Sequence, residues 1–148
     1  MDIMDVEERK VLVAIDYFSR SIWAKVLGKR TGGEVVEAVK EGARPVEIIT
    51  DNGSEFDNKI FKKMCWDNGI EHRLVGVEAH RSNGRVERVI RTLREGLVKN
   101  KEGEFEERLK NVVGKYNWTY HSAIRCSPRE AWEDKSGVAQ VQNNGKNS

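Results

Sequence analysis

The feature that most constrains the fold is a short apolar run, residues 46–50 (VEIIT), between two segments whose apolar residues recur at helical spacing. The first of these, residues 31–45, places valines on one face and ends in glycine and proline. The second, residues 57–69, begins with Asp57 as a candidate cap and brings Ile60 to its apolar face. A buried strand between two helices predicts a sheet covered by helices.

Further strand-like runs stand before and after these segments. Residues 11–16 and 21–27 are rich in β-branched and aromatic residues, and the polar turn between them predicts a hairpin. Residues 1–4 and 70–76 are two more short candidates. Helical patterns fill the rest of the chain, so the order predicts a mixed sheet with helices on its faces.

The chain has 148 residues, enough for one domain with a real core. It contains no apolar stretch that suits a secretion signal or a membrane span. Its two cysteines lack any metal-binding or redox spacing, which indicates reduced intracellular thiols. The three histidines also lack such spacing, so we expect no zinc.

Charge is distributed unevenly, although the formal net charge is only +2. Residues 81–101 hold seven lysines and arginines against two glutamates. Such local asymmetry indicates an anionic partner at one face of the molecule.

A helix over residues 82–97 carries an acid among these arginines. Four apolar residues form its buried stripe: Val86, Ile90, Leu93 and Leu97. Glu87, Arg91 and Arg94 fall within roughly 60° of one another beside that stripe. The simpler interpretation is a Glu87–Arg91 ion pair, worth only about 0.2–0.5 kcal/mol. The alternative is that Glu87 holds a metal while the arginines hold a nucleic-acid backbone.

Asp51 follows the strand at residues 46–50, where Asn-Gly forces a turn. Its ordinary role would be that of a turn or cap aspartate. However, ligand sites in α/β sheets gather at the carboxyl ends of strands. Asp51 and Glu87, with a third acid, could therefore hold magnesium shared with a phosphate. We expect Glu55 to support the turn or the next helix.

Four segments together resemble the integrase catalytic core of retroviruses and Gypsy-type LTR retrotransposons: residues 12–27, 48–56, 80–95 and 115–132. Thirty-five residues separate Asp51 from Glu87, the spacing of this acid-triad family. Bacterial insertion-sequence transposases share the triad, but their glutamate segment reads differently from the SNGRVER of this chain.

The resemblance implies an α/β, ribonuclease-H-like fold: a five-stranded mixed sheet in the order 3-2-1-4-5 with helices on both faces. It covers residues 1–134 as an integrase catalytic core. Residues 135–148 are small and polar, and we expect a disordered tail there.

The first acid of the triad could be Asp2 or Asp16. The family places it on strand 1, which gives Asp2, whereas Asp16 ends the second strand. In the implied strand order, Asp16 stands one strand further from Asp51, about 4.8 Å. Metals roughly 3.5–4 Å apart are not easily bridged across that gap. We therefore predict Asp2 as the catalytic acid and Asp16 as a turn acid beside Ser19 and Arg20.

The resemblance implies metal-dependent polynucleotidyl transfer on DNA, with element ends and target DNA as substrates and a homodimer or higher oligomer as the assembly. Three acids would be catalytic and would bind two Mg²⁺ or Mn²⁺ ions: Asp2, Asp51 and Glu87. Three arginines would contact DNA phosphates: Arg88, Arg91 and Arg94. A eukaryotic retroelement protein of this kind would act in the nucleus, and no membrane is expected.

Two rival functions stay open from the sequence. A catalytically inactive, integrase-derived module could bind nucleic acid or protein; the short lead-in before Asp2 favours it, and the intact triad opposes it. A ribonuclease-H-type hydrolase of RNA–DNA hybrids is a weaker rival, because the triad spacing and the SNGRVER segment disfavour it.

Overall fold

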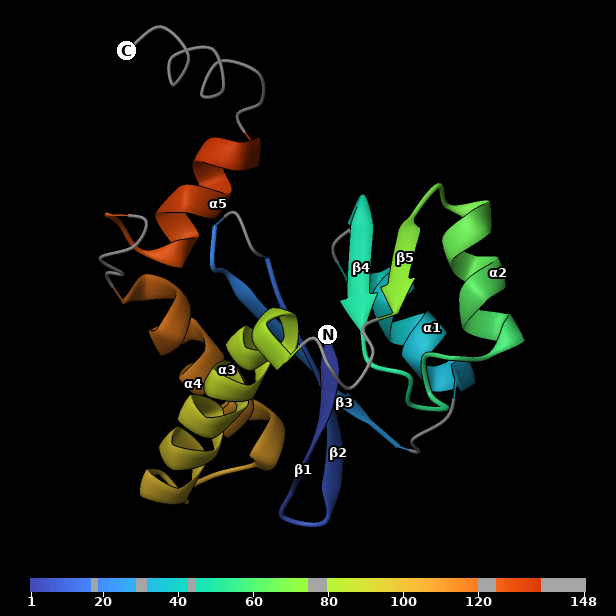
Figure 1. The fold of residues 1–148 in the computed structure, drawn as a ribbon. Helices are drawn as coiled ribbons and strands as arrows, with labels where there is room; N and C mark the ends of the chain where they lie inside the picture. Colours follow the sequence, from blue (N-terminus) through green and yellow to red (C-terminus); the bar gives the residue numbers. More distant parts are fainter. Residues whose placement is uncertain (17–18, 29–31, 43–44, 75–79, 120–124, 137–148) are drawn as a thin grey trace, which may run out of the picture.

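The computed structural model describes residues 1–16, 19–28, 32–42, 45–74, 80–119 and 125–136 (Figure 1). The strands are β1 (Asp2–Val6), β2 (Arg9–Ile15), β3 (Ile22–Leu27), β4 (Glu47–Thr50) and β5 (Glu71–Leu74). The helices are α1 (Gly32–Glu41), α2 (Lys59–Asp67), α3 (His80–Lys99), α4 (Phe105–Trp118) and α5 (Pro128–Ser136). This order of elements is the predicted one. Most of the expected tail, residues 137–148, lies outside the described residues.

The strands of the described chain form two sheets. Strands β1, β2 and β3 are antiparallel in that spatial order, with Asp2 opposite Val13, and β4 pairs with β5 in parallel. The amino group of Met1 donates to the Ile49 carbonyl at 2.9 Å and links the two sheets. One continuous sheet in the order 3-2-1-4-5 is therefore not established, since β1 pairs with β2 but not, as a ladder, with β4.

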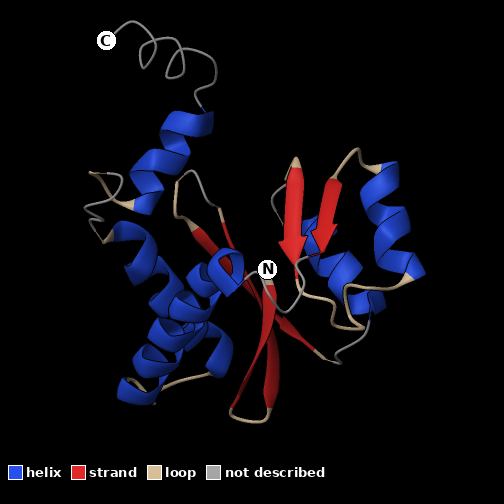
Figure 2. Cartoon of the chain, viewed as in Figure 1, coloured by secondary structure: helices blue, strands red, loops and turns tan. Residues whose placement is uncertain are grey.

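Helices cover both faces of the three-stranded sheet (Figure 2). Successive side chains of a strand point to opposite faces, so each strand contributes to two cores. One core packs against α1 and α2 and contains Ile3, Leu12 and Leu27. The other packs against α3 and α4 and contains Met4, Val11 and Val13.

Helix α3 lies along β1, and contacts to β1 and α4 hold its C-terminal end. Its predicted apolar stripe is buried, and Val89 joins it. The Arg94 guanidinium donates to the Asp5 carbonyl at 3.0 Å. Further along, Arg108 of α4 donates to the Leu97 carbonyl at 2.7 Å and pairs with Glu7 in the β1–β2 turn at 3.1 Å. Helix α3 and strand β1 therefore end at the same end of the molecule.

The start of α2 corrects the prediction for residues 57–69. The cap is Asn58, whose Oδ1 accepts from the Phe61 N–H at 2.8 Å. Asp57 instead pairs with Lys62 at 2.9 Å on the surface. Ile60, expected on the apolar face, is 58% exposed, because it lies about 100° around the helix from Phe61, outside the arc that Phe61, Met64 and Cys65 bury.

Candidate active site

Two of the predicted acids meet where β1 begins and β4 ends. Asp2 is the first residue of β1, and Asp51 directly follows β4. The bond from the Met1 amino group to Ile49 holds these two strand ends together. The structure therefore brings Asp2 and Asp51 near each other from opposite sides of the junction between the sheets.

The charges of Asp51 and Glu55 both act on Asp2 at this junction. The pKa of Asp2 is raised above its ordinary value of 3.8, chiefly by burial and further by the charges of Asp51 and Glu55. The Ile3 N–H, which donates to the Asp2 carboxylate at 2.8 Å, opposes this rise. Burial lowers the pKa of the Met1 amino group to about 6, although the same two aspartates favour its charged form. A cation placed here would relieve the repulsion among the carboxylates.

The turn after β4 aims a second acid at Asp51. The Asp51 Oδ1 accepts from the Gly53 N–H at 2.9 Å, as a turn aspartate does. A Cβ built on Gly53 would lie 2.8 Å from a Glu55 oxygen and 3.0 Å from the Asp51 Oδ1. Both carboxylates therefore lie close over Gly53. The sequence predicts only a supporting role for Glu55; its four-residue offset from Asp51 across a glycine turn is the signal that indicates its place beside Asp51.

Glu87 lies exposed on α3. In the described part of the chain it makes no hydrogen bond or ion pair, so the simpler interpretation, an ion pair with Arg91, is wrong. The carboxylate is therefore not held by any neighbour among the described side chains of its own helix.

The height of Glu87 along β1 follows from the Arg94 bond to Asp5. Glu87 precedes Arg94 by two helical turns, about 10.5 Å at 1.5 Å per residue. Asp2 precedes Asp5 by three strand residues, about 10 Å. Because α3 and β1 end at the same end of the molecule, Glu87 lies in the half of α3 that is nearer the start of β1.

The three acids do not form one ligand set in this structure. Across the described ranges, no group of three His, Cys, Asp or Glu side chains is placed to hold a metal ion. Carboxylate oxygens are nevertheless the donors that Mg²⁺ and Mn²⁺ prefer. The donors of Asp2 and Asp51 fit such an ion, and Glu87 is the acid that would have to move closer.

The three predicted DNA-binding arginines take different positions on α3. Arg94 donates a hydrogen bond to the Asp5 carbonyl of β1. Arg91 is exposed on the same side of α3 as Glu87. Arg88 donates to the Gly84 carbonyl at 3.3 Å and lies toward Tyr116. Burial raises the pKa of the Tyr116 hydroxyl, and the positive charges of Arg20 and Arg88 oppose that rise.

Asp16 lies in the β2–β3 turn, away from this site. Its Oδ2 accepts from both the N–H and the hydroxyl of Ser19, at 3.0 and 2.7 Å. The interpretation of Asp16 as a turn acid beside Ser19 is confirmed.

Solved structures share this fold. The catalytic core domain of BIV integrase matches with a TM-score of 0.80 at 20% sequence identity, over 93% of this chain and 94% of that one. A chain of the simian T-cell lymphotropic virus intasome in complex with the PP2A regulatory subunit B56 gamma matches with a TM-score of 0.76 at 22% identity, over 88% of this chain and 51% of that one. The class of fold is therefore the ribonuclease-H-like α/β fold of integrase cores.

The sequence pattern of the integrase core domain matches residues 1–78, and the chain belongs to that family. An uncharacterized protein of Caenorhabditis elegans is 40% identical over 85 residues, 56% of this chain and 7% of that protein. A putative uncharacterized transposon-derived protein of the same organism is 32% identical over 127 residues, 80% of this chain. The chain spans less than half the length of these relatives, 44% for the second. Among the described helices, none is long and apolar enough to cross a membrane.

Proposed function

We propose that this chain is an integrase catalytic core that performs metal-dependent 3′-end processing and strand transfer of retroelement DNA into target DNA. The observation that carries the proposal is the meeting of Asp2 and Asp51 at one junction; Glu87 on α3 is the third acid that the resemblance implies. Acids kept close against mutual repulsion are typical of a cation site.

Asp2 and Asp51 would hold two Mg²⁺ or Mn²⁺ ions, and Glu87 would complete the set. When bound, such ions supply Lewis-acid stabilisation of the phosphodiester and a nucleophile activated at neutral pH. The protein's own part is to position the carboxylates: Asp2 through its strand and the Ile3 N–H, Asp51 through its turn. Glu87 carries no competing hydrogen bond within the described residues, so it can turn toward the site.

The arginine side of α3 would hold the DNA. Arg91 is exposed one turn beyond Glu87, and Arg94 and Arg88 flank it. Phosphate contacts of this kind fix the position of a duplex without reading its sequence. A phosphodiester held there would lie next to the acids, which supports contact of all three arginines with backbone near the reacting bond.

The active form would be a homodimer or a higher oligomer on DNA. Support comes from the fold shared with a chain of a viral intasome. Element ends and target DNA would be its partners, and nuclear action would follow for a eukaryotic element.

Glu87→Gln tests this function. With labelled duplex oligonucleotides and Mn²⁺, we expect strand transfer to fall by roughly a hundredfold or more, the scale of losing one electrostatic contact to a transition state. The matched control is Glu95→Gln, another exposed acid of α3, which should keep full activity. Direct titration with Mn²⁺ should show weaker binding for Glu87→Gln alone.

The outcomes of these assays distinguish the proposed function from the two alternatives, an inactive interaction module and a hydrolase of RNA–DNA hybrids. An active Glu87→Gln protein would contradict the site assignment. A parent chain that binds duplex DNA but neither binds Mn²⁺ nor joins strands would be the inactive interaction module. Cleavage confined to RNA–DNA hybrids would indicate the hydrolase.

A further inference from the structure

A buried hydroxyl stands directly before Asp51 in the chain. Thr50 ends β4, and its side chain is fully buried. Its Oγ1 donates to the Asp51 carbonyl at 3.0 Å and lies 2.8 Å from Nε2 of His72 in β5. A buried hydroxyl is unfavourable unless it is hydrogen-bonded, and an apolar side chain of the same size would avoid that cost. These three residues therefore form a chain of hydrogen bonds that ends at a predicted metal ligand.

The number of protons available fixes the direction of this chain. A hydroxyl has one proton, and Thr50 gives it to the Asp51 carbonyl, so the bond to His72 needs a proton from Nε2 of the ring. Burial lowers the pKa of His72 below its ordinary 6.5; the charge of Lys62 lowers this pKa further, and Asp57 opposes both. The ring is therefore neutral at neutral pH and carries one proton, on Nε2.

The imidazole of His72 is held in place by α2. Ile48, two residues before Thr50, stands opposite His72 in the parallel pairing of β4 with β5. Thr50 and His72 therefore project from the same face of these strands. On that face the Phe61 ring of α2, which is fully buried, meets the imidazole edge-on, with ring centroids 4.7 Å apart. This packing keeps Nε2 directed at the Thr50 hydroxyl.

The same helix holds the far end of the turn that carries Asp51. Phe56 packs edge-on against Phe61, with ring centroids 5.6 Å apart, and its N–H donates to the Gly53 carbonyl at 3.0 Å. The Gly53 N–H in turn donates to the Asp51 carboxylate. The turn is therefore fixed from α2 at both ends, through Gly53 at its end and through the buried hydroxyl at its start.

We propose that Thr50 and His72 are positioning residues for Asp51: His72 donates from Nε2 to Thr50, and Thr50 fixes the Asp51 carbonyl so that the carboxylate stays at the junction with Asp2. This inference rests on the proposed function, because it requires Asp51 to bind a metal ion. Neither positioning residue touches the metal or the DNA. Hydrogen-bond partners that orient a metal ligand raise the affinity of the site and its activity.

NMR of the metal-free chain tests the hydrogen-bond chain directly. The ¹⁵N shifts of His72 should show a protonated Nε2 and an unprotonated Nδ1 at neutral pH. A proton on Nδ1 would overturn the proposal, because Nε2 would then accept the Thr50 proton and leave the Asp51 carbonyl without it.

Amide hydrogen exchange of the metal-free chain reports on the turn itself. In Thr50→Val the Gly53 amide should exchange roughly tenfold faster, because the carboxylate that accepts from it is held less firmly. The Phe61 amide, which donates to the Asn58 side chain, is the reference and should not change. Unchanged exchange at Gly53 would overturn the proposal.

Thr50→Val keeps the shape of the side chain and removes only its hydroxyl. Direct titration should show Mn²⁺ affinity roughly tenfold weaker or more. The kcat of strand transfer should fall by a similar factor, whereas KM for DNA should stay the same. Thr50→Ser keeps the hydroxyl and should restore both quantities. His72→Phe keeps a ring against Phe61 but has no Nε2–H, so it should share the defect of Thr50→Val.

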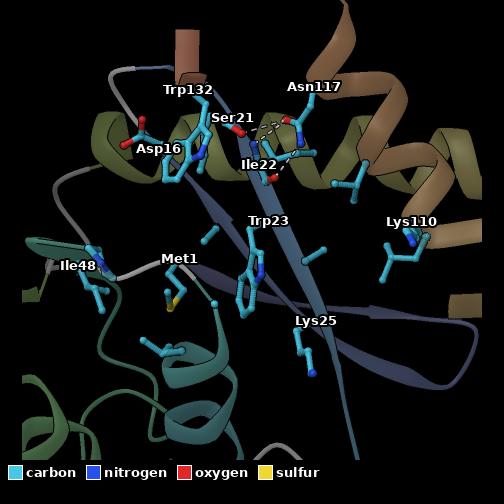
Figure 3. Close-up of a pocket in the computed structure, with 18 of the residues that line it drawn as sticks. Met1, Asp16, Ser21, Ile22, Trp23, Lys25, Ile48, Lys110, Asn117 and Trp132 are labelled. Carbon is cyan, nitrogen blue, oxygen red and sulfur yellow. Dashed lines mark hydrogen bonds between the residues drawn. The ribbon is translucent and has the colours of Figure 1, made fainter. Parts of the chain in front are cut away.

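The matched control is Asn117→Ala, which removes a polar side chain that bonds twice to Ile22 in β3 (Figure 3). It should lower stability without changing Mn²⁺ affinity. A Thr50→Val protein with the Mn²⁺ affinity and kcat of the parent would overturn this inference alone. Failure of both Thr50→Val and His72→Phe to fold would also overturn it, because the pair would then be structural. A parent chain that binds no Mn²⁺ would overturn the proposed function, and this inference with it.

Discussion

Acids stand at strand ends in two regions of the molecule, and the two regions treat them in opposite ways. In the β2–β3 turn, Asp16 accepts two hydrogen bonds from Ser19, and Asn117 fastens the neighbouring strand to α4. At the junction of β1 and β4, Asp2 is half-buried beside the charges of Asp51 and Glu55, and its pKa is raised. Asp16 is stabilised by hydrogen bonds within the fold. At Asp2, by contrast, burial and the neighbouring charges disfavour the charged carboxylate.

The difference separates a structural role from a functional one. A turn acid stabilises the fold through its hydrogen bonds, so replacing it lowers the free energy of unfolding. An acid repelled by its neighbours costs stability while it is charged, and its benefit must come from a ligand that neutralises it. Each experiment below changes one region and uses the other as the reference.

The largest effect should come from Asp51→Asn compared with Asp16→Asn. Asp51→Asn should reduce metal-dependent strand transfer by roughly a hundredfold or more, since a carboxylate ligand is lost. Its melting temperature should not fall, because asparagine can still accept from the Gly53 N–H. Asp16→Asn should keep the activity of the folded protein. Equal loss of activity in both variants would contradict the assignment of a functional role to Asp51 and a structural role to Asp16.

An intermediate effect is expected for Asn117→Ala, which changes only the structural region. The Asn117 side chain accepts from the Ile22 N–H at 2.8 Å and donates to the Ile22 carbonyl at 3.0 Å. Losing both bonds across the α4–β3 contact should lower the free energy of unfolding by about 1–3 kcal/mol in urea denaturation. Asn100→Ala, an exposed asparagine outside the helices, is the matched control and should stay within about 0.5 kcal/mol. Lost activity without lost stability would contradict the structural role.

The element order and the acids at strand ends could be predicted from sequence because both signals are local. The stripe of α3 follows from 3.6-residue spacing, and Asp51 follows from a buried strand that stops at Asn-Gly. Asp2 was preferred over Asp16 through the strand position that the resemblance implies, and the Ser19 bonds give Asp16 its turn role. The N-cap of α2 is harder to predict from sequence, because Asp57 and Asn58 are adjacent and both are residue types that cap helices.

The contacts that position the site could not be predicted in the same way. Arg94 reaches the carbonyl of Asp5, 89 residues away, and no periodicity encodes that bond. The closing of Glu55 and Asp51 over Gly53 depends on turn geometry. The separation of the strands into two sheets depends on how far β1 runs beside β4, which is a tertiary property.

The smallest expected effect is the pH dependence of stability that Asp2 contributes. Its folded-state pKa lies above the ordinary 3.8, so between these two values the folded chain binds more protons than the unfolded one. Its contribution is fully present below 3.8 and is lost as the pH rises through the folded pKa, which is the opposite of a salt-bridged acid. The side chain is only half-buried, so solvent screening keeps the effect below that of Asn117→Ala.

Denaturation of the parent chain and Asp2→Asn across this range, kept below the value of about 6 at which the Met1 amino group titrates, isolates the contribution of Asp2. The difference in unfolding free energy between the two proteins should shift in favour of Asp2→Asn as the pH rises. Saturating Mg²⁺ should reverse that shift, because it stabilises only the chain whose carboxylate can bind it. A difference that does not change with pH or Mg²⁺ would place Asp2 with Asp16 as an acid satisfied by the fold.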